Sequence, residues 1–145
     1  MKIFTIGFTR KSAATFFGLL RQPGLVRLMD VRLNNVSQLA GFTKKDDLKF
    51  FVENLNGLAY AHLPLLAPSA EILQTYKKSG GNWAIYEQQF LALMAQRQVE
   101  STISPDLLKG ACLLCSEASP AQCHRRLVAE YLQAHWPALE IEHLV

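Results

Sequence analysis

The sequence contains no apolar run that approaches the ~20 residues needed for a membrane-spanning helix. Its first residues, MKIFTIGFTRKS, have too short an apolar core for a secretory signal peptide, and KIFTI predicts a β-strand instead. Cysteine is scarce and odd in number, at three residues, so the sequence offers no disulfide framework. These absences argue against membrane and small disulfide-rich secreted proteins, and we expect a cytoplasmic location.

A strong charge of one sign is also absent. The chain has 15 lysines and arginines against 12 aspartates and glutamates, which gives a formal net charge of +3. This mild excess does not require a nucleic-acid partner. No internal repeat, low-complexity tract or long linker divides the 145 residues. A chain of this length favours one domain, which we expect to span residues 1–145.

Segments with strand character alternate with amphipathic helical segments along the whole chain. Strands are predicted at residues 2–6, 25–31, 58–63, 111–115 and 139–144, and helices at 13–21, 43–55, 70–78, 83–99 and 120–135. Alternation of this kind is typical of an α/β fold. We expect a three-layer domain with a mostly parallel sheet of about five strands and helices on both faces.

Four of the predicted helices have start signals in the sequence. Ser12 and Ser69 are expected to cap the helices that follow them, and Thr43 with Asp46 resembles a capping box. The segment Ser119-Pro120-Ala121-Gln122 predicts another helix start, with the serine as N-cap and the proline as the first helical residue. Cys123, the following residue, would therefore lie in the first turn of this helix.

The stretch LLCSEASPAQCHRR, residues 113–126, gathers the most reactive side chains of the chain. Ligands of parallel sheets bind beyond the carboxyl ends of the strands, where the fourth predicted strand ends. A helix N-terminus nearby favours anions and lowers the pKa of a thiol. We therefore expect one crevice with four candidate catalytic residues, which are Cys115, Glu117, Cys123 and His124.

Two other predicted strands also end in polar loops on the same side of the sheet. One loop is Gly7 to Arg10, after the first strand. The other is Asp30 to Gln38, after the second strand, and it is rich in amides, including Asn35 and Gln38. An arginine from this second loop could bind an anion together with an arginine from the CHR segment. The candidate ligand-binding residues are Gly7, Thr9, Asp30, Arg32, Asn34, Ser37 and Arg125.

The three cysteines are expected to differ from one another. Cys112 lies three strand positions before Cys115 and should face the opposite side of the sheet. Cys115 and Cys123 should lie close together, with Cys123 the more acidic thiol provided that its sulfur is not buried. Either of these two could instead be a small buried hydrophobe.

Other groups in these segments also have structural interpretations. His124 and Arg125 are adjacent on a predicted helix and are not expected both to point inward. At least one of them should therefore lie at the surface or cap the helix. Asp30 and Arg32 could simply pair with each other. Cys115, Cys123 and His124 could supply three metal ligands, but their spacing matches no zinc motif, and we predict no metal.

Trp83 and Tyr86, which follow Gly80-Gly81, could belong to a flap over the crevice. An aromatic helix face packed on the sheet is the alternative. A strand that ends in a cysteine and is followed by a loop and a helix is also the architecture of cysteine phosphatases and rhodaneses. The phosphatase motif is absent here, because the loop lacks glycine and a correctly spaced arginine.

Four segments resemble the domain-of-unknown-function family numbered 488. They are TIGFT, DVRLNNVSQLAGFTKKDDL, SGGNWAIYEQQFLALM and LLCSEASPAQCHRRLVAEYL, which occur in the family's order over essentially the whole chain. The family's opening motif is often Ile-Gly-His-Ser, whereas Phe8 and Thr9 occupy the last two places here. The resemblance implies a compact α/β domain of a kind usually found as a bacterial or archaeal stand-alone protein, and it supplies no reaction.

The leading hypothesis from the sequence is a small enzyme that acts on a phosphorylated or nucleotide-like ligand through a crevice of cysteine, histidine and arginine. The alternative is a non-catalytic module that binds nucleic acid or a protein partner, although its basic residues are scattered along several elements. The sequence does not identify a cofactor, a substrate or an oligomeric state, so all three are left open.

Overall fold

The computed structural model describes residues 1–34, 41–117 and 120–145. These residues form an α/β fold around a five-stranded, all-parallel sheet with the strand order β3-β2-β4-β1-β5. The strands are β1 (Lys2–Gly7), β2 (Arg27–Asp30), β3 (Ala59–His62), β4 (Ala111–Cys115) and β5 (Glu140–Leu144). The predicted fold class is confirmed.

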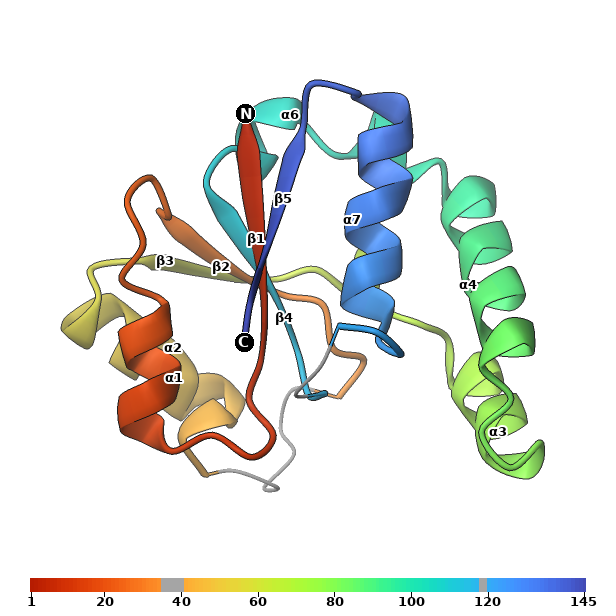
Figure 1. Ribbon diagram of the computed structural model, residues 1–145, viewed down its shortest axis with the longest axis horizontal. Coiled ribbons are helices and arrows are strands. Elements are labelled where there is room, and N and C mark those ends of the chain that lie inside the picture. Colours follow the sequence, from red (N-terminus) through yellow and green to blue (C-terminus); the bar gives the residue numbers. More distant parts are fainter. Residues whose placement is uncertain (35–40, 118–119) are drawn as a thin grey trace.

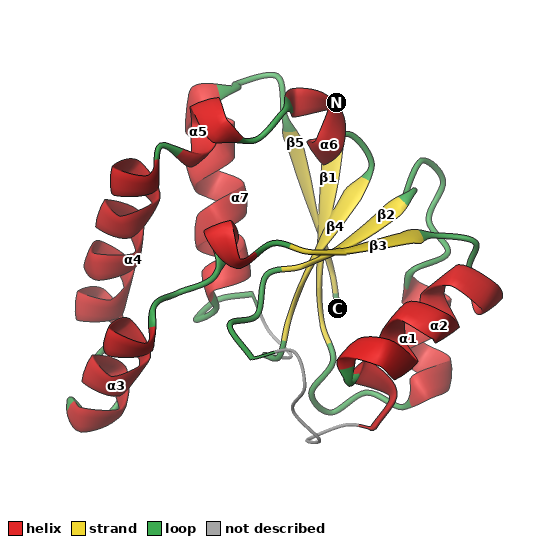
Figure 2. Cartoon of the chain, turned by 180° about the vertical axis from the view of Figure 1, so that it is seen from behind, coloured by secondary structure: helices red, strands yellow, loops and turns green. Residues whose placement is uncertain are grey.

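Helices cover both faces of this sheet (Figures 1 and 2). The elements between the strands are α1 (Ala13–Leu19), η1 (Gly41–Thr43), α2 (Lys45–Leu55), η2 (Pro64–Leu66), α3 (Ala70–Lys78), α4 (Trp83–Arg97), α5 (Val99–Thr102), α6 (Pro105–Leu108) and α7 (His124–His135). On one face lie α1 and α2. On the other, α7 packs on the sheet, α4 packs on α7, and α3 packs on α4. The pair α3–α4 is therefore an outer layer.

The core consists of two apolar clusters, one on each face of the sheet. Phe16 of α1 and Leu48 of α2 pack with Cys112 and Leu114 on one face. Leu113 of β4 packs with residues of α4 and α7 on the other face. Successive β4 side chains alternate between the two clusters, as the pleat of a strand requires. Cys112 therefore faces away from α7, as predicted.

Several helix boundaries follow local signals in the sequence. Ser12 and Ser69 accept hydrogen bonds from the N–H groups of Thr15 and Ile72, which confirms both predicted caps. The prediction of a capping box at Thr43 is wrong. This threonine is buried in η1, and α2 begins at Lys45 without a side-chain cap.

The largest boundary error concerns α7. This helix begins at His124, with Cys123 as a cap residue that makes no side-chain capping bond, rather than at Pro120. The predicted cap, Ser119, lies outside the described residues. Pro120 to Gln122 form a turn between β4 and the helix. The reactive residues therefore lie at the very start of the helix.

Two smaller differences concern the ends of other elements. Strand β2 is shorter than predicted and begins at Arg27, and α4 ends at Arg97. The connection between Pro105 and Gly110 contains the short helix α6. Among the described residues, no helix is both long enough and apolar enough to span a membrane.

Candidate functional site

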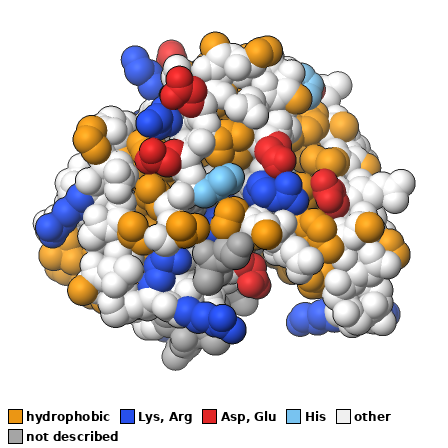
Figure 3. Space-filling model, in the orientation of Figure 1, with side chains coloured by type: hydrophobic (Ala, Val, Ile, Leu, Met, Phe, Trp, Pro, Cys, Tyr) orange, Lys and Arg blue, Asp and Glu red, His pale blue; other side chains and the backbone are white. Residues whose placement is uncertain are grey.

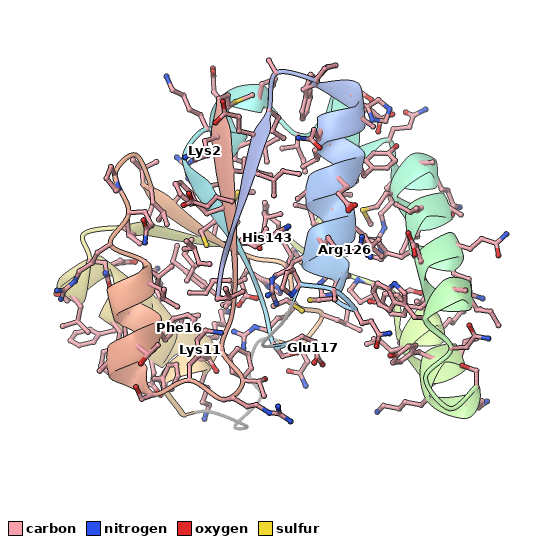
Figure 4. All side chains as sticks on the ribbon, in the orientation of Figure 1. Lys2, Lys11, Phe16, Glu117, Arg126 and His143 are labelled. Atoms are coloured by element: carbon pink, nitrogen blue, oxygen red, sulfur yellow. The ribbon has the colours of Figure 1, made fainter. Side chains whose placement is uncertain are left out.

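The carboxyl ends of the parallel strands meet the start of α7 at one edge of the sheet. This edge is the lower one in Figure 4, where Glu117 lies just beyond the end of β4. A pocket of about 470 Å³ opens here, between the sheet edge and the α3–α4 layer. The molecule is visibly hollowed at this place in Figure 3. We call it the carboxyl-edge pocket; its walls include Phe8, Arg32, Asn34, Tyr76, Trp83, Tyr86, Glu117, Gln122, Cys123 and His124.

At the base of the pocket lie two thiols and an imidazole. The Sγ atoms of Cys115 and Cys123 and a ring nitrogen of His124 all lie within 4.8 Å of one another. All three residues are buried, with exposed fractions of 4%, 2% and 7% respectively. We call this group the Cys-Cys-His cluster. The predicted proximity of Cys115 and Cys123 is confirmed, and the histidine joins them.

His124 is held by contacts on both ring nitrogens. Its Nε2 lies 2.7 Å from the carbonyl oxygen of Val31, and its Nδ1 lies 3.3 Å from the Sγ of Cys115. Because a carbonyl can only accept, Nε2 carries the proton of this hydrogen bond. Nδ1 consequently faces the thiol. The Phe90 ring packs against the imidazole at 5.5 Å between centroids.

The two thiols of the cluster differ in acidity, and the condition set for an acidic Cys123, an exposed sulfur, is not met. Hydrogen bonding with Cys123 lowers the pKa of Cys115 against the opposing effect of burial, helped by the backbone N–H groups of Ser116 and Glu117. Burial, followed by hydrogen bonding with Cys115, raises the pKa of Cys123 well above its ordinary value. The helix start does not make Cys123 the more acidic thiol because its sulfur is buried.

Arg125 supports the cluster from behind the pocket. Its side chain is fully buried and donates to the carbonyl oxygen of Glu117, and its Nη1 lies 3.7 Å from the Sγ of Cys123. Arg125 is not among the described residues that line the pocket. Both His124 and Arg125 point inward, contrary to expectation, because the first turn of α7 rests on the sheet edge between β2 and β1.

Arg32 forms a polar part of the pocket wall. Its guanidinium makes a two-point ion pair with Asp30, with Nε to Oδ1 at 2.8 Å and Nη2 to Oδ2 at 2.7 Å. Nη2 also donates to the Thr43 carbonyl at 2.7 Å, and the Phe8 ring lies 5.4 Å from the guanidinium carbon. Burial opposes the charge of Arg32, but its hydrogen bonds and attraction to Asp30 prevail and raise its pKa.

One nitrogen of the Arg32 guanidinium takes no part in these hydrogen bonds. Nη1 of Arg32 is buried and has no hydrogen-bond partner among the described residues. Asp30 is fully buried and also accepts from the Tyr60 hydroxyl at 2.6 Å. Asp30, which lies behind the pocket wall, therefore holds Arg32 in place. The Asp30–Arg32 ion pair considered in the sequence analysis is present.

Gly7 and Thr9 hold the loop that follows β4. A Cβ atom at Gly7 would collide with the carbonyl oxygen of Glu117. The hydroxyl and the N–H of Thr9 both donate to the carbonyl oxygen of Ser116. These two predicted ligand-binding residues thus lie outside the pocket wall and support it. Asn34 lines the pocket, whereas Ser37, Asn35 and Gln38 lie outside the described residues.

The outer wall of the pocket is aromatic. Trp83 and Tyr86 stack at 4.9 Å between centroids with 17° between their planes, and Tyr76 meets Tyr86 edge-on at 5.2 Å. Tyr86 is buried and also belongs to the core cluster on the α7 face. The two aromatic residues singled out in the sequence therefore both pack and line the pocket. Tyr76 was missed, and its position seven residues before Trp83 carried no signal by itself.

Comparison with known proteins gives one match. The family model described as "Domain of unknown function DUF488" matches residues 12–132, which include every member of the Cys-Cys-His cluster. Neither the curated proteins nor the solved structures that were searched gave a match. The matched segment covers more than half of the chain, and the protein therefore belongs to the DUF488 family.

Proposed function

We propose that this protein is a small enzyme that binds a phosphorylated, nucleotide-like ligand in the carboxyl-edge pocket. The observation that carries the proposal is the pairing of two unlike walls. One wall presents a buried arginine with an unpartnered N–H group, and the other presents stacked aromatic rings. A ligand with an anionic group at one end and a flat ring at the other satisfies both.

Arg32 receives the anionic group. A buried N–H without a partner costs about 1–3 kcal/mol, and a ligand oxygen that accepts from it removes this cost. The ion pair with Asp30 and the bond to Thr43 fix the guanidinium, so little side-chain entropy is lost on binding. The sequence suggested that Arg125 binds the anion together with Arg32. Arg125 takes no part in this contact because its side chain is fully buried behind the cluster.

Trp83 receives the ring. Stacking of a nucleobase on an aromatic side chain contributes about 1–3 kcal/mol and tolerates different bases. Trp83 lines the pocket and remains partly exposed, and its stacking on the buried Tyr86 fixes its orientation.

The Cys-Cys-His cluster is the reactive centre. Cys123 and His124 line the pocket, and the carboxylate of Glu117 lines it beside them. Glu117 is the group that exchanges protons with the ligand or with water, because both ring nitrogens of His124 are already engaged, by the Val31 carbonyl and by the Cys115 thiol. This combination of a concave pocket, polar anchors and a cluster of ionisable side chains favours an enzyme over a passive binding module.

Fluorescence of Trp83 provides a direct test. The chain has two tryptophans, so a Trp136→Phe background leaves Trp83 as the only one. Titration with AMP and GMP is expected to quench its emission to saturation, while adenosine, which lacks the phosphate, binds at least about tenfold more weakly.

Arg32→Lys keeps a positive charge beside Asp30 but removes Nη1, and we expect it to weaken AMP binding by about tenfold or more. Arg97→Lys is the matched control, because Arg97 bonds to backbone carbonyls of residues 64–67 and lies outside the pocket. Circular dichroism checks that both variants fold. The proposal is wrong if neither nucleotide quenches saturably, or if AMP binds equally well to folded Arg32→Lys.

A further inference from the structure

We propose that the Cys-Cys-His cluster binds a thiophilic divalent metal ion, with Zn²⁺ as the natural occupant, and leaves one coordination position open to the carboxyl-edge pocket. This inference goes beyond the proposed ligand and does not depend on it. It replaces our expectation from the sequence, in which the spacing of Cys115, Cys123 and His124 matched no zinc motif. The fold brings together ligands that the sequence separates.

The donor atoms already have nearly the spacing that zinc requires. Zn–S bonds of about 2.3 Å and Zn–N bonds of about 2.0 Å at tetrahedral angles place the donor atoms roughly 3.5–3.8 Å apart. In the cluster all three atoms lie within 4.8 Å of one another, and Sγ of Cys115 lies 3.3 Å from Nδ1 of His124. Changes of up to about 1 Å in the distances between donor atoms would complete the geometry.

His124 is oriented as a metal ligand is. Metal-binding histidines almost always donate their second ring N–H to a carbonyl or carboxylate, which fixes the tautomer and the ring plane. Nε2 of His124 makes this bond to the Val31 carbonyl at 2.7 Å. The lone pair of Nδ1 is thereby directed at the two sulfurs, and the Phe90 ring restricts rotation of the imidazole.

N–H groups and a guanidinium lie against the two sulfurs. Backbone N–H groups of Ser116 and Glu117 point at Cys115, and the guanidinium of Arg125 approaches Cys123. Metal binding requires thiolates, and the charge of a divalent ion balances two of them. Among the described residues, no carboxylate joins the three-ligand group, so zinc would not be over-coordinated by the protein.

The position of the cluster indicates the kind of site. Cys123 and His124 line the pocket, whereas Cys115 lies behind them and is not among the lining residues described. An ion bound to all three would sit at the pocket base with its fourth position facing the cavity. Three protein ligands and one exchangeable position distinguish catalytic zinc sites from closed structural ones. The ligand class at that position is water or an oxygen atom of the pocket's occupant.

Co²⁺ serves as the spectroscopic probe. Reduced, metal-free protein is titrated with Co²⁺ alone, and we expect one equivalent to produce intense visible bands of tetrahedral cobalt with a sulfur-to-cobalt charge-transfer band in the near ultraviolet. One equivalent of Zn²⁺ should then abolish these bands, because zinc competes for the same site.

Matched variants assign the ligands. Loss of a residue that only orients a metal ligand typically weakens metal binding by about 10–100-fold. Cys115→Ser and Cys123→Ser remove ligands themselves, so each should weaken Co²⁺ binding by more than this. Cys112→Ser is the control, since that thiol lies on the opposite face of the sheet and should leave the spectrum unchanged. A spectrum that persists in folded Cys115→Ser or Cys123→Ser, or that disappears in folded Cys112→Ser, overturns the proposal.

The unmodified protein provides a test that does not depend on how variants fold. We expect Zn²⁺ to slow alkylation of Cys115 and Cys123 by at least about tenfold, because metal-bound thiolates are withdrawn from reaction. The proposal fails if the reduced protein gives only weak octahedral cobalt bands, or if Zn²⁺ protects neither thiol. Formation of a Cys115–Cys123 disulfide, together with no cobalt binding after reduction, would identify a redox pair instead.

Discussion

The imidazole Nε2 of His124 lies 2.7 Å from the carbonyl oxygen of Val31, and this contact joins the start of α7 to the end of β2. Val31 directly precedes Arg32, so one short segment positions both the histidine of the cluster and the arginine of the pocket wall. The hydrogen bond that sets the tautomer therefore also ties the cluster to the segment that carries Arg32.

The first prediction concerns this tautomer. In metal-free protein at neutral pH, Nε2 of His124 is expected to carry a slowly exchanging proton, because the Val31 carbonyl is its buried acceptor. Long-range ¹H–¹⁵N correlation spectra identify the protonated nitrogen. His135 is an internal comparison, since its Nδ1 lies 3.0 Å from the Tyr131 carbonyl and should be protonated there. A neutral His124 with its proton only on Nδ1 would contradict the assignment.

Gly7→Ala should destabilise the fold. A methyl group there meets the carbonyl oxygen of Glu117, which belongs to the backbone and cannot rotate away. We expect the free energy of unfolding to fall by about 1–3 kcal/mol in urea titrations. Gly18→Ala is the control: its Cβ meets nothing within 4 Å and lies in helix α1, so a gain of about 0.5–1 kcal/mol is expected. Equal effects at both glycines would argue against the close approach of the two loops.

Asp30→Ala should be more harmful than removal of a surface ion pair. It leaves the Arg32 guanidinium buried without its counter-ion, which typically costs about 3–5 kcal/mol. Glu130→Gln breaks the exposed pair with Arg126 on α7 and should cost less than about 1 kcal/mol. Thermal and urea unfolding of both variants measure the difference. If Asp30→Ala unfolds like wild type, Asp30 does not hold Arg32.

Cys112 should stay unreactive until the protein unfolds. Burial raises the pKa of this thiol, and its side chain is fully enclosed between β4 and α1. In native protein, peptide mapping after treatment with a small alkylating reagent is expected to find Cys112 unmodified, and its labelling rate should rise with urea in parallel with global unfolding. Labelling of Cys112 ahead of both cluster thiols in buffer would show that this face of the sheet opens locally.

Local signals in the sequence predicted most of the fold. The run ACLLC gave the bounds of β4 correctly because an apolar pentapeptide between Gly110 and Ser116 has few alternatives to a buried strand. Ser12 and Ser69 were identified correctly because a cap interacts only with its own first turn. Properties that depend on neighbours within a few residues were thus accessible.

The errors arose where distant contacts override such signals. Ser119-Pro120 has the form of a helix start, yet α7 begins at His124, whose ring is bonded to Val31 far away in the chain. The prediction of a cap at Thr43 was wrong for a similar reason. Its carbonyl accepts a hydrogen bond from Arg32, and the residue is buried. Cys123 was expected to be the more acidic thiol only if its sulfur were not buried, and its burial, which depends on packing, raises its pKa despite its place beside a helix end.

The candidate site was predicted in part. Cys115, Glu117, Cys123 and His124 do gather at one edge of the sheet, because strand ends and the following helix start are adjacent in any parallel α/β fold. The position of Arg125, outside the pocket lining, depends on which side of the first α7 turn faces β1. No periodicity in the sequence specifies that choice.

The strand order has a consequence for how the chain acquires its structure. Strands β1 and β2 are consecutive in the chain but are separated in the sheet by β4, which is made from residues 111–115. Neither can complete its hydrogen-bonded ladder until this late segment inserts between them, and closing so long a loop slows folding. Insertion of β4 also delivers Cys115 to the sheet edge. A ribosome-bound chain that stops short of Ala111 consequently holds β1 unjoined to the β2–β3 pair, and the pocket base is completed only when Cys123 and His124 follow β4 into place.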